Sequence, residues 1–308
     1  MSDILELAEK LQDTQAALSR LEKSAAQNPN LPSIALSLNS LRNRQKSLEE
    51  QFGELADSLG VDVCSYRMFP EKTQRPTVKT LTSALSDFQT LFTEVYNAIK
   101  KGARERGGRV TGDVLAETSF GYAYSFTGSV GFVLTLPNEK LLLGETVLDT
   151  AMRVISDMVK AETPEQIAAF KDELGLAPIR SMYKWAEDHT LGGIGADIQW
   201  RRQQEVRTSI FVQQPQLENL RRTIARTSEI DEKEYHIEGQ LVGLDTKYKT
   251  FHLEVEGIPD IKGKILFDID PAHPIACPAF YRVNIRTETI IHYSTAQEDV
   301  SYFLVSLE

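Results

Sequence analysis

Cysteine and long apolar runs are what this chain has least of. Only 2 of its 308 residues are cysteines, which excludes a small secreted domain held together by disulfides. No stretch approaches the roughly 20 consecutive apolar residues that a membrane-spanning helix needs. The first residues include Asp3, Glu6 and Glu9, so they lack the basic and then apolar pattern of a secretion signal. We therefore expect a cytoplasmic protein that is not an integral membrane protein.

Several motifs of catalysis and cofactor binding are absent as well. There is no Gly-x-x-x-x-Gly-Lys-Ser/Thr segment, which is the phosphate-binding loop of many nucleotide hydrolases. Gly193-Ile194-Gly195 lacks the third glycine and the preceding strand of a dinucleotide site. Gly128-Ser129-Val130-Gly131 departs from Gly-x-Ser-x-Gly and falls where a hairpin is expected to turn, which argues against Ser129 as a nucleophile. We expect no cofactor and lean against an enzyme, while a catalytic site of scattered carboxylates is left open.

The pattern of metal-ligating residues also predicts no metal site. Cys64 and Cys277 are far apart in the sequence, and neither belongs to a Cys-x-x-Cys pair. The segment 268–277 contains four candidate ligands, but its prolines favour a rigid turn. The five histidines show no pair four residues apart on a helix, although His236 and His252 could meet across adjacent strands.

The acidity of the chain is unevenly distributed. The 44 acidic and 34 basic residues give a net charge of −10. Residues 227–308 alone carry a balance of −8, whereas residues 61–226 have a balance of +1 and residues 1–60 a balance of −3. Nucleic-acid binding follows local patches more than total charge, so the overall acidity is a weak argument against it.

The clearest periodic signal lies in residues 1–60. Apolar residues recur there at alternating spacings of three and four, first from Ile4 to Ala25 and again from Ile34 to Leu59. This 3.5-residue repeat is typical of a coiled coil. The segment 27–32 between the two series contains two prolines, which cannot continue a helix because they lack the backbone N–H. The sequence therefore predicts an antiparallel coiled-coil hairpin.

A two-helix hairpin buries only one apolar stripe, so it needs a further surface for stability. The hairpin either packs on its own globular body or mediates self-association or the binding of a protein partner, and its regularity favours the second hypothesis. Gln45 would then be a buried polar residue that determines the register of the helices. The predicted interface residues are Ile34, Leu38, Leu41, Gln45, Leu48, Phe52 and Leu55.

Residues 61–226 mix strand and helix patterns, which predicts an α+β middle domain and not a doubly wound sheet. The expected elements are a strand at 61–66, a helix at 81–99, a hairpin at 120–136, helices between 144 and 190, two strands between 196 and 212, and a short helix at 217–224.

The first strand of that hairpin carries an aromatic residue at every second position, namely Phe120, Tyr122, Tyr124 and Phe126. Alternate residues of a strand share a face. We expect this aromatic ladder to be a buried face covered by helices. The alternative is an exposed platform on which nucleic-acid bases stack.

Residues 227–308 contain five alternating apolar runs and no helical period, which predicts a small five-stranded β-barrel of the OB or SH3-like type. The local balance of −8 argues against a phosphate backbone as its ligand, because that binding depends on Lys and Arg. Binding of a protein, or packing within the chain, is the better hypothesis. The expected domains are thus 1–60, 61–226 and 227–308.

Arginines gather near the end of the middle domain, where six lie within 26 residues that include only Glu205 and Glu218 as acids. The planar guanidinium group suits phosphate contacts, so these residues and the basic segment after the long helix could form one basic face. Alternatively, they pair with the chain's own acidic residues. The candidate phosphate-binding residues are Arg201, Arg202, Arg207, Arg221, Arg222, Arg226, Lys101 and Arg104.

The order of a helical hairpin, an α+β body and a terminal barrel is loosely similar to accessory proteins of bacterial mobile-element or anti-phage systems. This is a resemblance of architecture that transfers no site residue. Our first hypothesis is a non-enzymatic interaction or sensor subunit that assembles through residues 1–60. The alternative is a protein that binds nucleic acid or anionic lipid through the arginine-rich face.

Overall fold

The protein has a mixed α+β fold, as the sequence predicts. The computed structural model divides into two compact units, Met1–Ala225 and Arg226–Glu308. A separate domain for residues 1–60 stays a prediction. The residues that the structure describes are 2–27, 31–70, 76–102, 110–126, 130–138, 144–203, 205–269 and 275–308.

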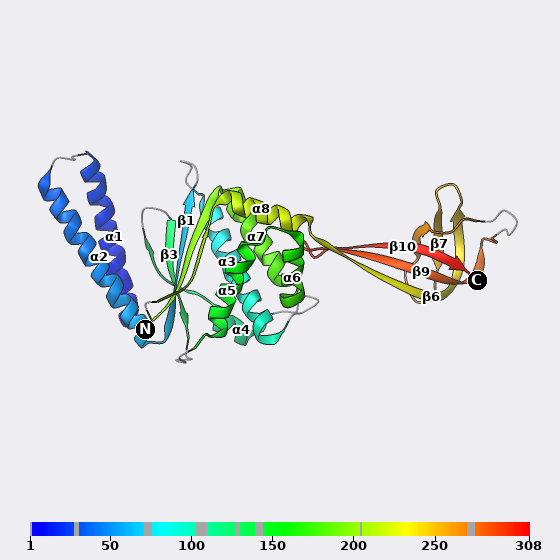
Figure 1. Ribbon diagram of the computed structural model, residues 1–308, viewed down its shortest axis with the longest axis horizontal. Helices are drawn as coiled ribbons and strands as arrows, with labels where there is room; N and C mark the ends of the chain where they lie inside the picture. Colours follow the sequence, from blue (N-terminus) through cyan, green and yellow to red (C-terminus); the bar gives the residue numbers. More distant parts are fainter. Residues whose placement is uncertain are drawn as a thin grey trace. The chain divides into compact units, whose positions relative to one another are not determined.

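The first unit begins with two long helices, α1 (Ser2–Gln27) and α2 (Pro32–Ser58), which lie side by side (Figure 1). α2 starts at a proline, which is tolerated there because the first helical N–H has no partner within the helix. Arg42 Nη2 donates to Glu22 Oε1 across the two helices at 3.1 Å. The coiled-coil geometry stays a prediction.

A five-stranded antiparallel sheet follows, in the order β2-β3-β1-β4-β5. The central strand β1 pairs with both β3 and β4, and Cys64, Tyr66 and Met68 on one of its faces are fully buried. The strands are β1 (Val61–Pro70), β2 (Gly121–Phe126), β3 (Val130–Pro137), β4 (Ile194–Arg202) and β5 (Glu205–Val212).

The remaining helices of this unit lie on one side of the sheet, and α1 and α2 lie on the other (Figure 1). Large aromatic side chains fill the core between helices and sheet, with Tyr66 of β1 against Phe88 at 4.9 Å between ring centroids. The sheet is therefore sandwiched between two helical layers. These helices are α3 (Val78–Lys101), α4 (Gly112–Thr118), α5 (Val147–Val159), α6 (Pro164–Leu174), α7 (Leu176–Gly192) and α8 (Gln214–Arg226).

The predicted aromatic ladder does not form one buried face. The pairing of β2 with β3 shifts register between Tyr122 and Tyr124, and such a bulge redirects the side chains that follow it. Phe120 stacks on Phe88 among the helices, whereas Tyr124 packs edge-to-face on Phe52 of α2, with 5.3 Å between centroids. Tyr122 is 54% exposed. The ladder is thus divided between the two sides of the sheet.

The second unit is a closed five-stranded barrel in the order β10-β8-β7-β6-β9, which confirms the predicted small barrel. β8 and β10 pair in parallel and the other neighbours pair antiparallel. Leu241, Phe251, Leu253, Val283 and Leu304 belong to its buried core. The strands are β6 (Ser228–Asp245), β7 (Thr250–Glu254), β8 (Ile261–Ile265), β9 (Ala279–His292) and β10 (Glu298–Leu307).

Candidate functional site: a cleft between α2 and the sheet

The face of the sheet that is turned toward α1 and α2 is only partly covered. Alternate residues of β1 and β4 reach this face, where Val63 lies opposite Arg201 and Ser65 opposite Gln199. One end of the helix pair is attached by apolar contacts, since Ala8, Leu11, Leu48 and Phe52 form a cluster with Tyr124 and Val133 of the sheet. This attachment leaves a cleft beside it.

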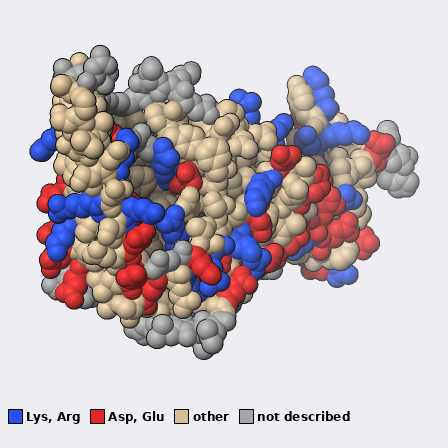
Figure 2. Space-filling view, turned by 60° about the vertical axis from the view of Figure 1, so that its left-hand side comes forward, with Lys and Arg blue, Asp and Glu red and all other residues tan. Residues whose placement is uncertain are grey.

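The cleft has a volume of about 590 Å³, which is within the usual range for small-molecule sites. Figure 2 shows a recess beside the two helices, with both basic and acidic side chains around it. Its lining combines an apolar floor with polar and charged walls. The lining residues are Gln15, Gln45, Lys46, Glu49, Glu50, Phe52, Gly53, Asp57, Val63, Ser65, Arg67, Tyr124, Phe126, Val133 and Arg201.

The two walls of the cleft carry different charges. Both cationic side chains of the sheet wall are arginines, Arg67 and Arg201, whereas the α2 wall carries three carboxylates and one lysine. Arg201 Nη2 donates to Gln199 Oε1 at 2.7 Å, and Glu49 Oε1 accepts from Gln45 Nε2 at 2.8 Å. Among the residues that the structure describes, neither Arg201 nor Glu49 forms an ion pair.

Two neutral polar side chains in the cleft are mostly buried, while their polar atoms are not among the buried atoms that lack a partner. Tyr124 is 6% exposed and Gln15 is 7% exposed. Within the described part of the chain, no group forms a hydrogen bond with the Tyr124 hydroxyl or with the Gln15 amide. Burial raises the pKa of Tyr124, the charge of Glu49 raises it further, and Arg201 opposes the rise. The hydroxyl is therefore a neutral hydrogen-bond donor at physiological pH.

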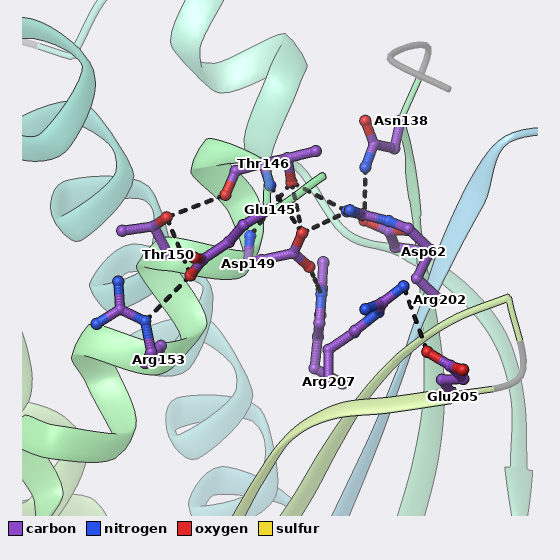
Figure 3. A network of polar contacts seen from close by, with 11 residues as sticks. Asp62, Asn138, Glu145, Thr146, Asp149, Thr150, Arg153, Arg202, Glu205 and Arg207 are labelled. Atoms are coloured by element: carbon purple, nitrogen blue, oxygen red, sulfur yellow. Dashed lines mark hydrogen bonds and ion pairs between the residues drawn. The ribbon is translucent and has the colours of Figure 1, made fainter. Parts of the chain in front are cut away.

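Arg202, the neighbour of Arg201, reaches the opposite face of the sheet and enters a buried polar network (Figure 3). Its Nη2 donates to Asp62 Oδ2 at 2.6 Å and its Nη1 donates to Asp149 Oδ2 at 2.5 Å. Asp62 also accepts from Asn138 Nδ2 at 2.9 Å. Arg202 thus joins β4 to β1 and to the first turn of α5, so it is occupied inside the protein.

The pKa of Asp149 in this network is lowered. Burial by itself raises the pKa, but hydrogen bonds from Thr146 and Trp200 and the charge of Arg202 outweigh that effect. The Asp149 side chain accepts from the Thr146 backbone N–H at 2.9 Å, and the Thr146 hydroxyl accepts from the Asp149 backbone N–H at 3.3 Å, which forms a capping box. The carboxylate therefore stabilises both the start of α5 and the contact with β4.

The other predicted phosphate-binding residues lie on several different elements. Arg207 lies 3.4 Å from Glu205 on β5, Arg221 and Arg222 both pair with Glu218 on α8, and Arg226 ends that helix. Lys101 at the end of α3 pairs with Asp113 at 3.3 Å. Arg104 lies outside the described residues. Phosphate binding by these residues stays a prediction, and of the described members of the set only Arg201 lines the cleft.

The predicted interface residues of α2 are buried to different degrees along the helix. Leu48 and Phe52 are buried and pack in the cluster on the sheet. Gln45 donates to Glu49 of its own helix, and Leu55 is not among the residues that line the cleft. Half-buried side chains occupy the other seam positions, namely Ile34, Leu38, Leu41, Gln45 and Leu55.

Hydrogen bonds to neighbouring groups explain why a histidine, His189, can be buried in the core. Trp185 Nε1 donates to the Tyr66 hydroxyl at 2.7 Å, and that hydroxyl lies 2.7 Å from His189 Nε2. His189 Nδ1 lies 3.3 Å from the carbonyl oxygen of Ile194, which can only accept, so Nδ1 carries the proton. Burial lowers the pKa of His189 to about 4. The imidazole is therefore neutral, and it links α7 to β1 and β4.

Histidines of the barrel do not meet as the sequence suggested. His236 lies opposite Asn284, and His252 lies opposite Gly243 and Lys262. His236 and His252 therefore do not lie opposite each other on the adjacent strands β6 and β7. His252, Glu254 and Asp260 place one ligand atom each within 4.8 Å of one another, but Glu254 and Asp260 are exposed and His252 already pairs with Asp260 at 2.9 Å. Residues 270–274 of the segment 268–277 lie outside the described part.

The candidate site contains residues that sequence reasoning did not single out as a group. Gln15 lies between apolar seam positions of α1, and Glu49 is one of many acids on α2. Tyr124 stood out only as a member of the aromatic ladder. No spacing along the chain connects these three residues.

None of the helices in the described ranges is both long enough and apolar enough to cross a membrane. No family model, no curated protein and no solved structure matches the chain, so the arrangement of its own residues must carry the functional argument.

Proposed function

We propose that this protein is a cytoplasmic, non-enzymatic sensor or adaptor subunit that assembles through a coiled coil formed by α1 and α2. The observation that carries the proposal is that apolar side chains are buried to different degrees at the two ends of the helix pair. Ala8, Leu11, Leu48 and Phe52 are buried on the sheet. Ile34, Leu38 and Leu41 are half-buried and, among the described residues, do not belong to that cluster.

Self-association supplies the missing cover for these three side chains. Two helices bury one stripe between them, whereas a four-helix arrangement of two hairpins buries the stripe on all sides. Full burial of one leucine contributes about 1.5–3 kcal/mol relative to exposure, so even partial gains at several positions favour association. The proposed partner is therefore the same segment of a second copy.

The test is the solution mass of the full-length chain, measured by light scattering over a range of protein concentrations. We expect an oligomer for the unchanged protein and a monomer for the double variant Leu38→Asp and Leu41→Asp. Leu36→Asp is the matched control, because Leu36 is 71% exposed and residues two apart do not share a helix face. Circular dichroism verifies that each variant is folded. A monomeric mass for the unchanged protein at every concentration contradicts the proposal.

We also infer that the C-terminal barrel is of the OB type and serves as a protein-binding module. The strand order and the parallel pairing of β8 with β10 support this type. The acidic balance of residues 227–308 favours a partner with a basic surface over a nucleic acid. The layout of the chain supports a role in bacterial anti-phage or mobile-element systems. The test of the barrel is whether a protein with a basic surface is retained on the immobilised full-length chain.

A further inference from the structure

We infer that the cleft between α2 and the sheet binds a small zwitterion of the amino-acid or short-peptide class. This inference deepens the sensor part of the proposed function and rests on it. The first support is a pair of polar groups that reach the cleft and have no hydrogen-bond partner among the described residues, the Tyr124 hydroxyl and the Gln15 amide. Neither group belongs to the buried side-chain atoms that lack a partner, so both are accessible from the cleft and can form hydrogen bonds with a ligand. A ligand in the cleft can bond to both groups from the side of the helices and the sheet at once.

The second support is the separation of opposite charges across the cleft. Arg201 on β4 and Glu49 on α2 both lie close enough to the Tyr124 hydroxyl to affect its acidity. Within the described residues they nevertheless form no ion pair with each other or with another side chain. A ligand that carries one charge of each sign can bridge the two walls.

The chemistry of each wall determines how such a ligand is oriented. The planar guanidinium of Arg201 suits a carboxylate, which can also accept a hydrogen bond from the Tyr124 hydroxyl. An ammonium group can donate to the Glu49 carboxylate and to the amide oxygen of Gln15. Apolar groups of Phe52 and the other floor residues contact the rest of the ligand.

The same walls disfavour a simple anion. The three carboxylates of the lining, Glu49, Glu50 and Asp57, balance its three cations, so the cleft has no net positive charge to attract inorganic phosphate or a polyanion. An uncharged ligand would leave Arg201 and Glu49, both exposed, without charged partners. The balance of charges in the cleft therefore selects for a zwitterion.

The test is isothermal titration calorimetry of the full-length protein with the twenty free amino acids and a panel of Gly-Xaa dipeptides. Acetate, methylamine and inorganic phosphate are the single-charge controls. We expect at least one zwitterion to bind and the single-charge controls not to bind. Arg201→Gln, Glu49→Gln and Tyr124→Phe should each lower the affinity at least about tenfold, because charge-assisted and buried hydrogen bonds are the strong ones.

The matched controls lie outside the cleft on the same layers of the fold. Arg207→Gln removes an exposed arginine of the neighbouring strand, and Glu54→Gln removes an exposed carboxylate of α2. Both should leave the affinity unchanged. The inference is overturned if no zwitterion binds to the folded protein, if phosphate binds in preference, or if the control variants lose as much affinity as the cleft variants. Assembly, which tests the proposed function, is measured by light scattering without ligand. Ligand binding is measured separately by calorimetry, so a failure of one proposal can be distinguished from a failure of the other.

Discussion

Arg201 and Arg202 are adjacent in β4, yet Arg201 lines the cleft on one face of the sheet while Arg202 lies 2.6 Å from the buried Asp62 on the other. The strand alternates its side chains between faces, so two neighbouring arginines of the same chemistry acquire different roles. Arg201 lines the proposed ligand site, and Arg202 stabilises the fold.

Replacing Arg202 should lower the free energy of unfolding far more than replacing Arg201. Arg202→Gln leaves two buried carboxylates, Asp62 and Asp149, without their cation, and breaking a buried ion pair in this way costs about 3–5 kcal/mol. Arg201→Gln should change the free energy of unfolding by less than about 0.5 kcal/mol, as surface substitutions usually do. Urea unfolding of both variants measures the difference, and equal effects would show that the network contributes no stability.

Stability should fall on acidification because of His189. Its pKa in the folded protein is lowered to about 4 by burial, so below about pH 6.5 the unfolded chain binds the proton more readily than the native state. The loss begins near pH 6.5 and reaches about 3 kcal/mol below pH 4.

The contribution of His189 can be isolated by a difference measurement. His189→Gln removes the titrating group, so the gap in unfolding free energy between the unchanged protein and this variant should narrow as the pH falls from 7 to 4.5. Other carboxylates titrate equally in both proteins and cancel. A gap that stays constant over this range would contradict the pKa assignment.

Asp87 should have the opposite effect on pH dependence. Burial and the neighbouring Asp188 raise the pKa of Asp87 to about 6. The charged Asp87 therefore destabilises the folded protein above about pH 6. This destabilisation disappears as the Asp87 carboxyl is protonated at lower pH. Asp87→Asn should therefore raise the melting temperature at pH 7.5 and lose this advantage by pH 4. Glu173→Gln, which changes an exposed carboxylate on α6, is the control and should show no such trend.

Phe52 should hold the helix pair on the sheet. It is 3% exposed and packs edge-to-face on Tyr124, so Phe52→Ala removes a buried aromatic side chain at a cost of about 3–5 kcal/mol. Hydrogen exchange should then become faster in α1 and α2 while the barrel strands keep their protection. Unchanged exchange in both helices would mean that other contacts attach them.

Local patterns were sufficient for much of the fold. The apolar periodicity of residues 4–25 and 34–59 predicted two helices, and the structure has α1 and α2 there. Alternation in residues 227–308 predicted five strands, and they close into a barrel. Such predictions succeed because helices and strands depend on side chains three, four or two residues apart, which a sequence displays directly.

The candidate site was only partly foreseeable. Sequence reasoning singled out Arg201, Gln45 and Phe52, which line the cleft, but it did so for a phosphate site and a helix seam. Gln15, Glu49 and Tyr124 come together only when α1, α2 and β2 pack on one another. Even the orientation of Tyr124 depends on a bulge in the pairing of β2 with β3, which alternation alone does not predict.

By itself, the sequence determined the helix pair, the α+β character and the barrel, because these follow from short-range periodicity and turn chemistry. Tertiary structure alone decided that Asp62 pairs with Arg202, 140 positions away, and that Arg201 lines the cleft. Contacts at such separations depend on strand order and register, which are selected by the packing of the whole sheet and leave no local signal in the chain.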